Sequence, residues 1–261
     1  MERMSRVQFF PTRGFRALAA RLGFPVVLLL AAPCLNRAQQ LPSVAELLQQ
    51  FEITTVSFRQ FEVAKALVAT KDASILPKLE PWLTRTDRHL RGNAAFIFAS
   101  LGDSRGFDVI TAILADRSDR PFAQGVSGIA GSTAPEYLSK AQIKADRYYA
   151  AHLLGDLKDP RAVPILVPLL KDSDVNWIVP WSLGQIGDKS AIEPLIATLS
   201  DKDASMRVLT IYALVELKAA EALPRLRQLL GDNERSRFDK LESAAEAARA
   251  AIAKLETLPQ R

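Results

Sequence analysis

Very few side chains in this 261-residue chain could carry catalytic or metal chemistry. It contains two histidines, His89 and His152, and a single cysteine, Cys34. One cysteine cannot form an internal disulfide, and two separate histidines do not match the Cys/His spacing of a zinc or iron-sulfur site. No serine or cysteine nucleophile has a nearby base in the sequence. We therefore expect no catalytic residue, no metal site and no bound cofactor. We place His89 in a solvated inter-helix turn and His152 among packed aromatic side chains.

A glycine-rich segment could in principle bind phosphate. Gly125, Gly128 and Gly131 lie in an insertion over residues 117–142, which is longer than an ordinary connection between helices. No Lys-Ser/Thr pair follows these glycines and no strand pattern precedes them, which disfavours a phosphate loop. Loops beyond about 12 to 15 residues are usually functional or disordered. A surface excursion and a partner-contacting loop both remain open.

The first 38 residues have the order of a secretory signal peptide. Arg3, Arg6, Arg13, Arg16 and Arg21 precede an apolar run over residues 22–35, which is shorter than the roughly 20 residues of a membrane span. Ala38 offers a small residue for cleavage, so we expect an exported, periplasmic or extracellular protein that begins at Gln39. An uncleaved anchor is one alternative. Lipidation at Cys34 is another, although Pro33 before it fits such a site poorly.

The charge of the chain comes from this leader. The formal net charge is +5, with 34 basic and 29 acidic residues. Removal of residues 1–38 takes away six basic residues and one acidic residue, which leaves 28 of each. The folded part therefore has no basic excess that would indicate nucleic-acid binding, and a membrane could be contacted only through an uncleaved leader. The remaining chain lacks cysteine, which suits an oxidising compartment.

The rest of the chain repeats about every 30 residues. Five segments, beginning at Arg59, Arg91, Arg147, Asn176 and Arg207, each read as a helix, a short turn and a second helix. The central apolar residues of the first helices are spaced by 31, 56, 29 and 31 residues, where 56 is one period plus the insertion; they are Leu67, Phe98, Leu154, Leu183 and Leu214. A single helical hairpin of this size cannot bury both apolar faces, so neighbouring hairpins must stack.

We therefore predict an all-α fold, an α-solenoid of about five helical hairpins over residues 59–230. The predicted N-terminal cap covers residues 39–58, where Ser43 and Glu46 form a capping-box pattern. The predicted C-terminal cap covers residues 231–261 and includes an alanine-rich helix over 239–256. With 48% hydrophobic and 24% charged residues, the composition is globular and excludes a low-complexity chain.

The repeats resemble HEAT repeats, specifically the short HEAT-like type of phycobilisome lyase subunits. The resemblance covers roughly residues 59–230, and it is strongest in R..AA.LLGDLKDPRAVP from Arg147 and in SLGQIGD from Ser182. It implies a buried polar ladder of Arg91, Arg147 and Arg207, with Asp87 and Asp203 as partners. Asn176 replaces arginine in the fourth repeat. His89 and His152 are each followed by leucine, so neither forms the His-Glu dipeptide by which HEAT-like deoxyhypusine hydroxylases bind iron.

An aromatic column distinguishes the first helices from those of a plain solenoid. Its positions lie two and six residues before each central residue, opposite the shared core, so we expect them to point outward. With Tyr149 added, the candidate partner-binding residues are Phe96, Tyr148, Tyr149, His152, Trp177, Trp181 and Tyr212. The insertion could cover them, a partner protein could dock there, or the column could be a cofactor or saccharide platform. Pro180 is expected to kink its helix.

Two classes of function follow. The main prediction is a non-enzymatic scaffold of the cell envelope or exported fraction, a monomer that binds an unidentified protein partner, because solenoids offer extended binding faces. The alternative follows the resemblance: a lyase-like or oxidoreductase-associated accessory protein that acts on a protein-bound cofactor. Export argues against the phycobilin version of that alternative, because those lyases act inside cells.

Overall fold

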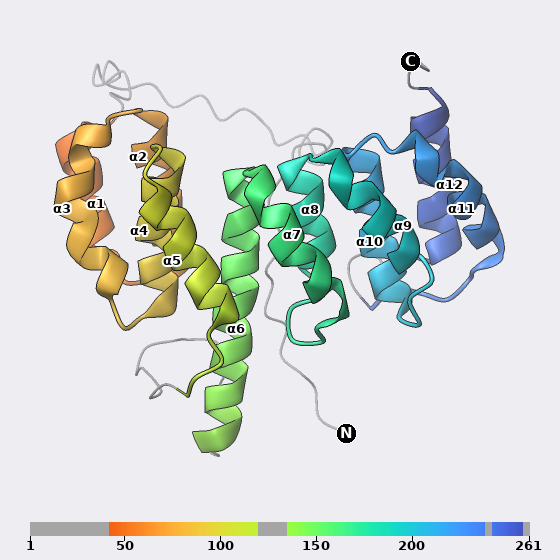
Figure 1. Ribbon diagram of the computed structural model, residues 1–261, viewed down its shortest axis with the longest axis horizontal. Coiled ribbons are helices and arrows are strands. Elements are labelled where there is room, and N and C mark those ends of the chain that lie inside the picture. The colour runs from red at the N-terminus through yellow and green to blue at the C-terminus, as the bar shows by residue number, and fades with distance from the viewer. Residues whose placement is uncertain (1–41, 120–134, 238–241, 258–261) are drawn as a thin grey trace, which may run out of the picture.

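The computed structural model describes residues 42–119, 135–237 and 242–257, and within these ranges the fold is an all-α solenoid, as predicted (Figure 1). No β-strand forms among these residues. Seven helices are α1 (Val44–Ile53), α2 (Ser57–Ala69), α3 (Leu76–Leu79), α4 (Arg88–Ser100), α5 (Ser104–Ala115), α6 (Pro135–Leu157) and α7 (Val163–Leu166). They are followed by α8 (Val179–Ile186), α9 (Ile192–Thr198), α10 (Ala204–Glu216), α11 (Leu223–Gln228) and α12 (Ala244–Glu256). The predicted signal peptide and the three insertion glycines lie outside the described residues.

The helices form two layers that run side by side along the molecule (Figure 1). One layer contains the first helices of the hairpins, α2, α4, α6, α8 and α10, and each packs against the next, with α12 packed on α10. The other contains α3, α5, α7, α9 and α11. Most of these second helices are short because prolines interrupt them: Pro77, Pro81, Pro164, Pro168 and Pro224 each lack the amide that a continuous helix needs, and 3-10 turns flank the short α segments.

The five hairpin turns share one backbone conformation. The residue four positions after each central apolar residue has a positive φ: 57° at Lys71, 93° at Gly102, 55° at Lys158, 79° at Gly187 and 54° at Lys218. This left-handed residue ends the first helix. In four of the five turns the next residue is an aspartate whose side chain caps the following helix: Asp72, Asp103, Asp159 and Asp188. The repeat is thus defined by its turns as well as by its core.

The core lies between the two layers and continues through all repeats. The five central side chains are fully buried, namely Leu67, Phe98, Leu154, Leu183 and Leu214. Both terminal helices begin with complete capping boxes, Ser43 with Glu46 in α1 and Ser243 with Glu246 in α12. None of the helices in the described ranges combines the length and the apolar character that a membrane span requires.

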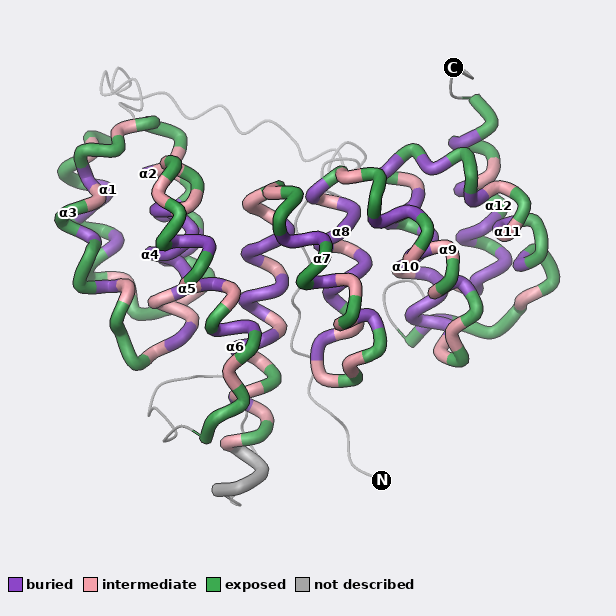
Figure 2. Tube along the Cα trace, viewed as in Figure 1, coloured by how far each residue is buried: buried purple, intermediate pink, exposed green. Residues whose placement is uncertain are grey.

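One local prediction is wrong. Pro180 does not kink a helix, because α8 begins at Val179 and places Pro180 in the first turn, where a missing amide costs nothing. The end of the insertion is helical, because α6 already begins at Pro135 and extends beyond the neighbouring helices at this end (Figure 2). Lys140 and Lys144 on this extension are exposed. Gln142 and Asp146 on this extension are nevertheless buried.

The structure contains the buried polar ladder, but its arginines pair with other carboxylates than those that the resemblance implies. Arg147 and Arg207 are buried and pair with Asp172 at 2.7 Å and Asp232 at 2.8 Å, carboxylates that follow the second helices. In the second repeat Arg88 takes this role and pairs with Asp116 at 2.6 Å, whereas Arg91 donates to the Arg85 carbonyl.

The partner prediction fails because two aspartates are already used as helix caps. Asp87 accepts hydrogen bonds from backbone amides at the start of α4, and Asp203 does so at the start of α10. The carboxylates that pair with the arginines lie instead at the far end of each hairpin.

Candidate functional site

Five rings from four first helices form one contiguous set, which we call the ring cluster. It consists of Phe61 on α2, Phe96 on α4, Tyr149 and His152 on α6, and Trp181 on α8. The Phe61 and Phe96 ring centroids are 4.9 Å apart, and those of His152 and Trp181 are 4.4 Å apart with an interplanar angle of 17°. Edge contacts join Phe61 to Tyr149 and His152 at 6.3 and 6.2 Å.

The stack of His152 on Trp181 depends on the close approach of α6 and α8. A Cβ atom at Gly155 would lie 2.8 Å from the Ser182 Cα and 3.0 Å from the Trp181 ring, so only glycine fits without displacement. His152, Gly155 and Asp156 lie on one face of α6 because residues three and four apart are neighbours on a helix. Trp181 therefore lies across the part of α6 that also carries the Asp156 carboxylate.

Polar groups border the ring cluster on this side. The His152 Nδ1 lies 3.4 Å from an Asp156 carboxylate oxygen, and the two side chains are 23% and 26% exposed. On α2, the Lys65 ammonium lies 5.2 Å from the centroid of the Phe61 ring and pairs with Glu62 at 2.7 Å. The cluster thus combines stacked rings, a neutral imidazole, a carboxylate and a lysine.

Burial shifts the two titratable groups of α6 in opposite directions. Burial, together with a smaller effect of the positive charge of Lys65, lowers the pKa of His152 to about 4. Burial raises the pKa of Asp156 to about 6, against the opposing effect of Lys65 and Lys158 and together with a small contribution from Glu62. At pH 7 the site therefore holds an uncharged imidazole and an ionised carboxylate.

These opposite shifts predict a change in pH dependence for Asp156→Asn. His152 binds its proton less readily when folded, so it makes the unfolding free energy rise from about pH 4 to 6.5. Asp156 binds its proton more readily when folded, so it makes that free energy fall from about pH 3.8 to 6. In Asp156→Asn only the His152 effect remains. Between about pH 4 and 6, the unfolding free energy of this variant should therefore rise by about 2 to 3 kcal/mol more than that of the native sequence.

Urea unfolding at pH 4, 5, 6 and 7 measures this slope. Asp108→Asn is the matched control, because Asp108 is an exposed carboxylate on α5, in the other layer. Parallel pH profiles for Asp156→Asn and the native sequence would show that Asp156 titrates normally.

A buried polar network supports the ring cluster from behind. The Tyr149 hydroxyl donates to the Asn93 side chain, whose amide donates to Gln60 at 3.0 Å. On the other side, the Tyr149 ring centroid lies 4.6 Å from that of His89, whose Nε2 is 3.3 Å from Asp146. Burial raises the pKa of Tyr149, which keeps its hydroxyl protonated.

The network corrects the predicted place of His89. That histidine lies in the first turn of α4 with only 15% of its side chain exposed. The sequence prediction of a solvated inter-helix turn is therefore wrong. The neighbouring Arg88 is buried, and Leu90 and Arg91 are partly buried.

The predicted aromatic column divides into two parts. Phe96 and Tyr149 are buried rather than outward-facing, Tyr148 is half-buried, and His152 and Trp181 are partly covered. The rings point across the first-helix layer and bury one another, which a helical wheel for a single helix does not show. Sequence reasoning missed Asp156 and Lys65, although the spacing of four residues between His152 and Asp156 is a signal for a contact on one helix.

The second part of the column lies apart from the ring cluster. Trp177 and Tyr212 are 40% and 45% exposed. The Arg237 guanidinium lies 5.7 Å from the Trp177 ring centroid, and the Tyr212 hydroxyl donates to the Glu242 carboxylate. The chain between α11 and α12 therefore already contacts both aromatic side chains.

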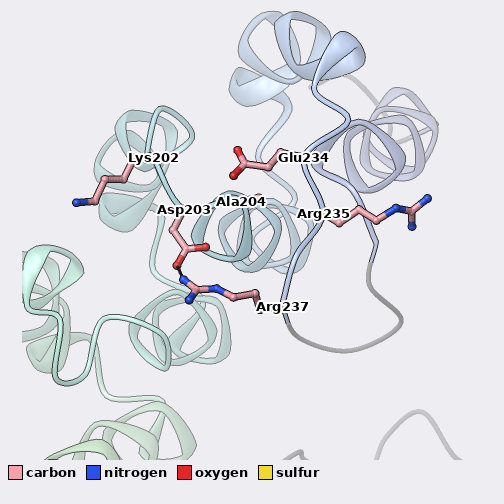
Figure 3. Close-up of a pocket in the computed structure, with 6 residues that line it drawn as sticks. All are labelled: Lys202, Asp203, Ala204, Glu234, Arg235 and Arg237. Atoms are coloured by element: carbon pink, nitrogen blue, oxygen red, sulfur yellow. Dashed lines mark hydrogen bonds and ion pairs between the residues drawn. The ribbon is translucent and has the colours of Figure 1, made fainter. Parts of the chain in front are cut away.

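The same connection borders a polar pocket of about 310 Å³ (Figure 3). Its lining residues are Lys202, Asp203, Ala204, Glu234, Arg235 and Arg237. Asp203 pairs with Arg237, and Glu234 pairs with Arg207, so the carboxylates are neutralised by their own neighbours. The Lys202 and Arg235 side chains point away from the centre (Figure 3). Nowhere in the described ranges do three or more His, Cys, Asp or Glu side chains form a group that could hold a metal ion.

The fold and the sequence agree on the class of protein. The family model for HEAT repeats matches residues 136–197 and 174–249, which span α6 to α12. HEAT repeats are therefore found over residues 136–249, and the described part of the chain as a whole is an all-α solenoid.

Curated relatives share a part of the chain. A phycocyanobilin lyase subunit alpha from Synechococcus elongatus is 36% identical over 96 residues, 33% of this chain and 35% of the relative. Two bilin biosynthesis proteins PecE, from Nostoc sp. and Mastigocladus laminosus, are 39% and 34% identical over 87 residues, 32% of this chain in each case. The chain spans about a third of the length of these relatives. An engineered protein of known structure aligns over 82% of this chain and 96% of its own at 19% identity, with a TM-score of 0.36.

These relatives contradict the main function predicted from the sequence, a non-enzymatic scaffold of the cell envelope. The scaffold prediction rests on the absence of a catalytic motif in the sequence. The names of the related proteins are stronger evidence than that absence. All three relatives bear the names of bilin lyase or bilin biosynthesis proteins, which favours the alternative, a lyase-like accessory protein.

Proposed function

We propose that this chain is a lyase-like accessory protein that handles a bilin chromophore destined for, or bound to, a partner protein. The observation that carries the proposal is the 36% identity over 96 residues to a phycocyanobilin lyase subunit. Two further relatives named for bilin biosynthesis support the same chemistry. Because the chain spans about a third of each, the activity, the substrate and the partner all belong to the proposal.

The ring cluster has the chemical character that a bilin requires. A bilin is an open-chain tetrapyrrole, a flat conjugated ligand with ring nitrogens and carboxylate side chains. Flat ligands of this kind stack on aromatic rings, and Trp181 and His152 present a stacked pair that is only partly covered. A carboxylate and an ammonium lie beside the rings, in Asp156 and Lys65. The second half of the column, at Trp177 and Tyr212, lacks this combination in the described structure.

Two measurements test the proposal with the full chain. Titration with phycocyanobilin should give a saturable change in visible absorbance and an induced circular dichroism signal. Addition of the chain to bilin and an apo-phycobiliprotein should then speed up covalent attachment, read as bilin fluorescence that survives denaturing electrophoresis. A chain that neither perturbs the bilin spectrum at about 100 µM nor accelerates attachment would overturn the proposal.

Export belongs to the proposal as a separate part. The arginine-rich leader and the apolar run support cleavage after Ala38. Expressed with its leader, the protein should accumulate in the exported fraction with an intact mass that begins at Gln39, as measured by mass spectrometry. Variants with the apolar run interrupted by two aspartates should remain inside the cell at full length. Recovery of the unprocessed native chain from the cell interior would contradict export and would remove the conflict with an intracellular bilin lyase.

A further inference from the structure

The Asp156 carboxylate has unused hydrogen-bonding capacity at the edge of the ring cluster. Within the described part of the chain, no residue donates a hydrogen bond to it, and its contact with the His152 Nδ1 at 3.4 Å lacks hydrogen-bond geometry. An ionised carboxylate accepts several hydrogen bonds, and a partly buried one gains most from them. Asp156 is 26% exposed, so a ligand on the surface can reach it.

The neighbouring charges favour a ligand that carries both N–H donors and carboxylates. Lys65 on α2 and Lys158 at the end of α6 are close enough to act electrostatically on Asp156. Glu62 is the acidic group on that side, and Lys65 is paired with it through exposed side chains, 45% and 69% accessible. Such an exposed pair is weak and exchanges readily for another carboxylate. The stacked rings of His152 and Trp181 lie next to these groups.

We propose that Trp181, Asp156 and Lys65 form the bilin-binding site: a pyrrole ring stacks on Trp181, ring N–H groups donate to the Asp156 carboxylate, and a ligand carboxylate pairs with Lys65. The inference rests on the proposed function for the identity of the ligand, and it adds the residues and their roles. His152 holds Trp181 in place as an uncharged stacking partner. Gly155 allows the Trp181 ring to lie directly against α6.

Other surfaces of the described structure offer weaker support for a ligand-binding site. Arg237 and Glu242 already contact Trp177 and Tyr212. Ile53, Val56 and Phe58 are exposed apolar residues near the start of α2, but nothing in the structure shows what covers them.

Asp156→Asn is the decisive variant, because the amide keeps the shape of the side chain and removes the charge. Phycocyanobilin is the probe, titrated into the full-length native chain and each variant, with absorbance and circular dichroism as readouts. Loss of hydrogen bonds to a charged acceptor should raise the dissociation constant by about 10-fold or more. It should also change the visible band of the bound bilin, because a carboxylate beside the ring nitrogens favours their protonated form. A purely structural role for Asp156 would leave that band unchanged.

Matched controls separate binding from folding. Asp108→Asn removes an exposed carboxylate from the other layer and should leave bilin affinity within about twofold. Trp181→Ala should weaken binding by at least about 10-fold, which lies in the lower part of the range for the loss of one stacked ring. Trp177→Ala, four residues earlier in the sequence, should leave binding unchanged. Thermal melts show which variants are folded, and Asp156→Asn stands on its own if Trp181→Ala unfolds.

The outcomes distinguish the two proposals. If the native chain binds bilin and Asp156→Asn binds with the same affinity and the same spectrum, the assignment of this site is wrong while the proposed function stands. If the native chain gives no saturable spectral change, the proposed function fails and the site assignment fails with it. Weaker binding by Asp156→Asn and Trp181→Ala, with both controls unchanged, supports the site.

Discussion

Arg88→Met is expected to lower the free energy of unfolding by about 3 to 5 kcal/mol, because it leaves a buried carboxylate without its cation. The Asp146 side chain is fully buried, and Arg88 is 5% exposed. Their charged atoms are 3.3 Å apart, and the same guanidinium pairs with Asp116 at 2.6 Å and bonds to the Ser118 hydroxyl at 2.9 Å. Methionine keeps the helix and much of the apolar volume, so the lost charge dominates the effect.

Denaturant unfolding at neutral pH measures the effect of Arg88→Met. A control variant and a double variant show whether the effect comes from the buried ion pair. Arg105→Met removes an exposed arginine that pairs with Glu80 and Asp103, so it should cost less than about 1 kcal/mol. The double variant Arg88→Met/Asp146→Asn removes both charges and should recover part of the loss. If Arg88→Met costs no more than Arg105→Met, the buried pair does not hold the second and third repeats together.

This ion pair also links the repeats to the candidate site. Asp146 contacts His89, His89 lies against Tyr149, and Tyr149 bonds to Asn93, so the chain of contacts runs from Arg88 to a member of the ring cluster. The bilin-binding residues proposed above lie on the partly covered side of that cluster. The buried ion pair and the proposed binding residues therefore lie in neighbouring parts of the same first-helix layer.

The sequence predicts the repeat because its signals are local. Apolar spacing within one helix, a left-handed turn residue and an aspartate cap are each determined by a few neighbouring residues. The central residues Leu67 and Leu154, for example, are buried as expected, and Lys71 and Lys158 adopt positive φ at equivalent positions.

The site is less predictable because its contacts join residues that are far apart in the sequence. Phe61 in the first repeat meets His152 in the third repeat, and a helical wheel places each side chain only relative to its own helix. The choice of Arg88 over Arg91 depends on Asp116 and Asp146, which come from other helical segments. Function is the least predictable from local patterns: no spacing of residues in the sequence indicates a particular reaction, and the bilin lyase proposal rests on related proteins instead.

Gly106→Ala is expected to lower the free energy of unfolding by about 3 kcal/mol or more, because α4 and α5 meet at this residue. A Cβ atom there would lie 2.2 Å from the Ala95 carbonyl oxygen and 2.3 Å from the Ala99 nitrogen. Both atoms belong to the backbone of α4, so neither can rotate away as a side chain could. The two helices must separate instead, and overpacking of this kind costs about 1 to 3 kcal/mol even where side chains can adjust.

Helix propensity favours the alanine variant, whereas steric overlap destabilises it, so the sign of the measured change shows which effect dominates. Alanine is favoured over glycine inside a helix by about 1 kcal/mol, so a measured loss reflects steric overlap and not the intrinsic preference. Gly231→Ala is the matched control, because a Cβ atom there meets nothing within 4 Å and its φ is not positive. Denaturant unfolding should show Gly231→Ala within about 0.5 kcal/mol of the native chain. Equal stability of the two variants would mean that α4 and α5 can move apart freely, and the close contact would then not hold the second hairpin together.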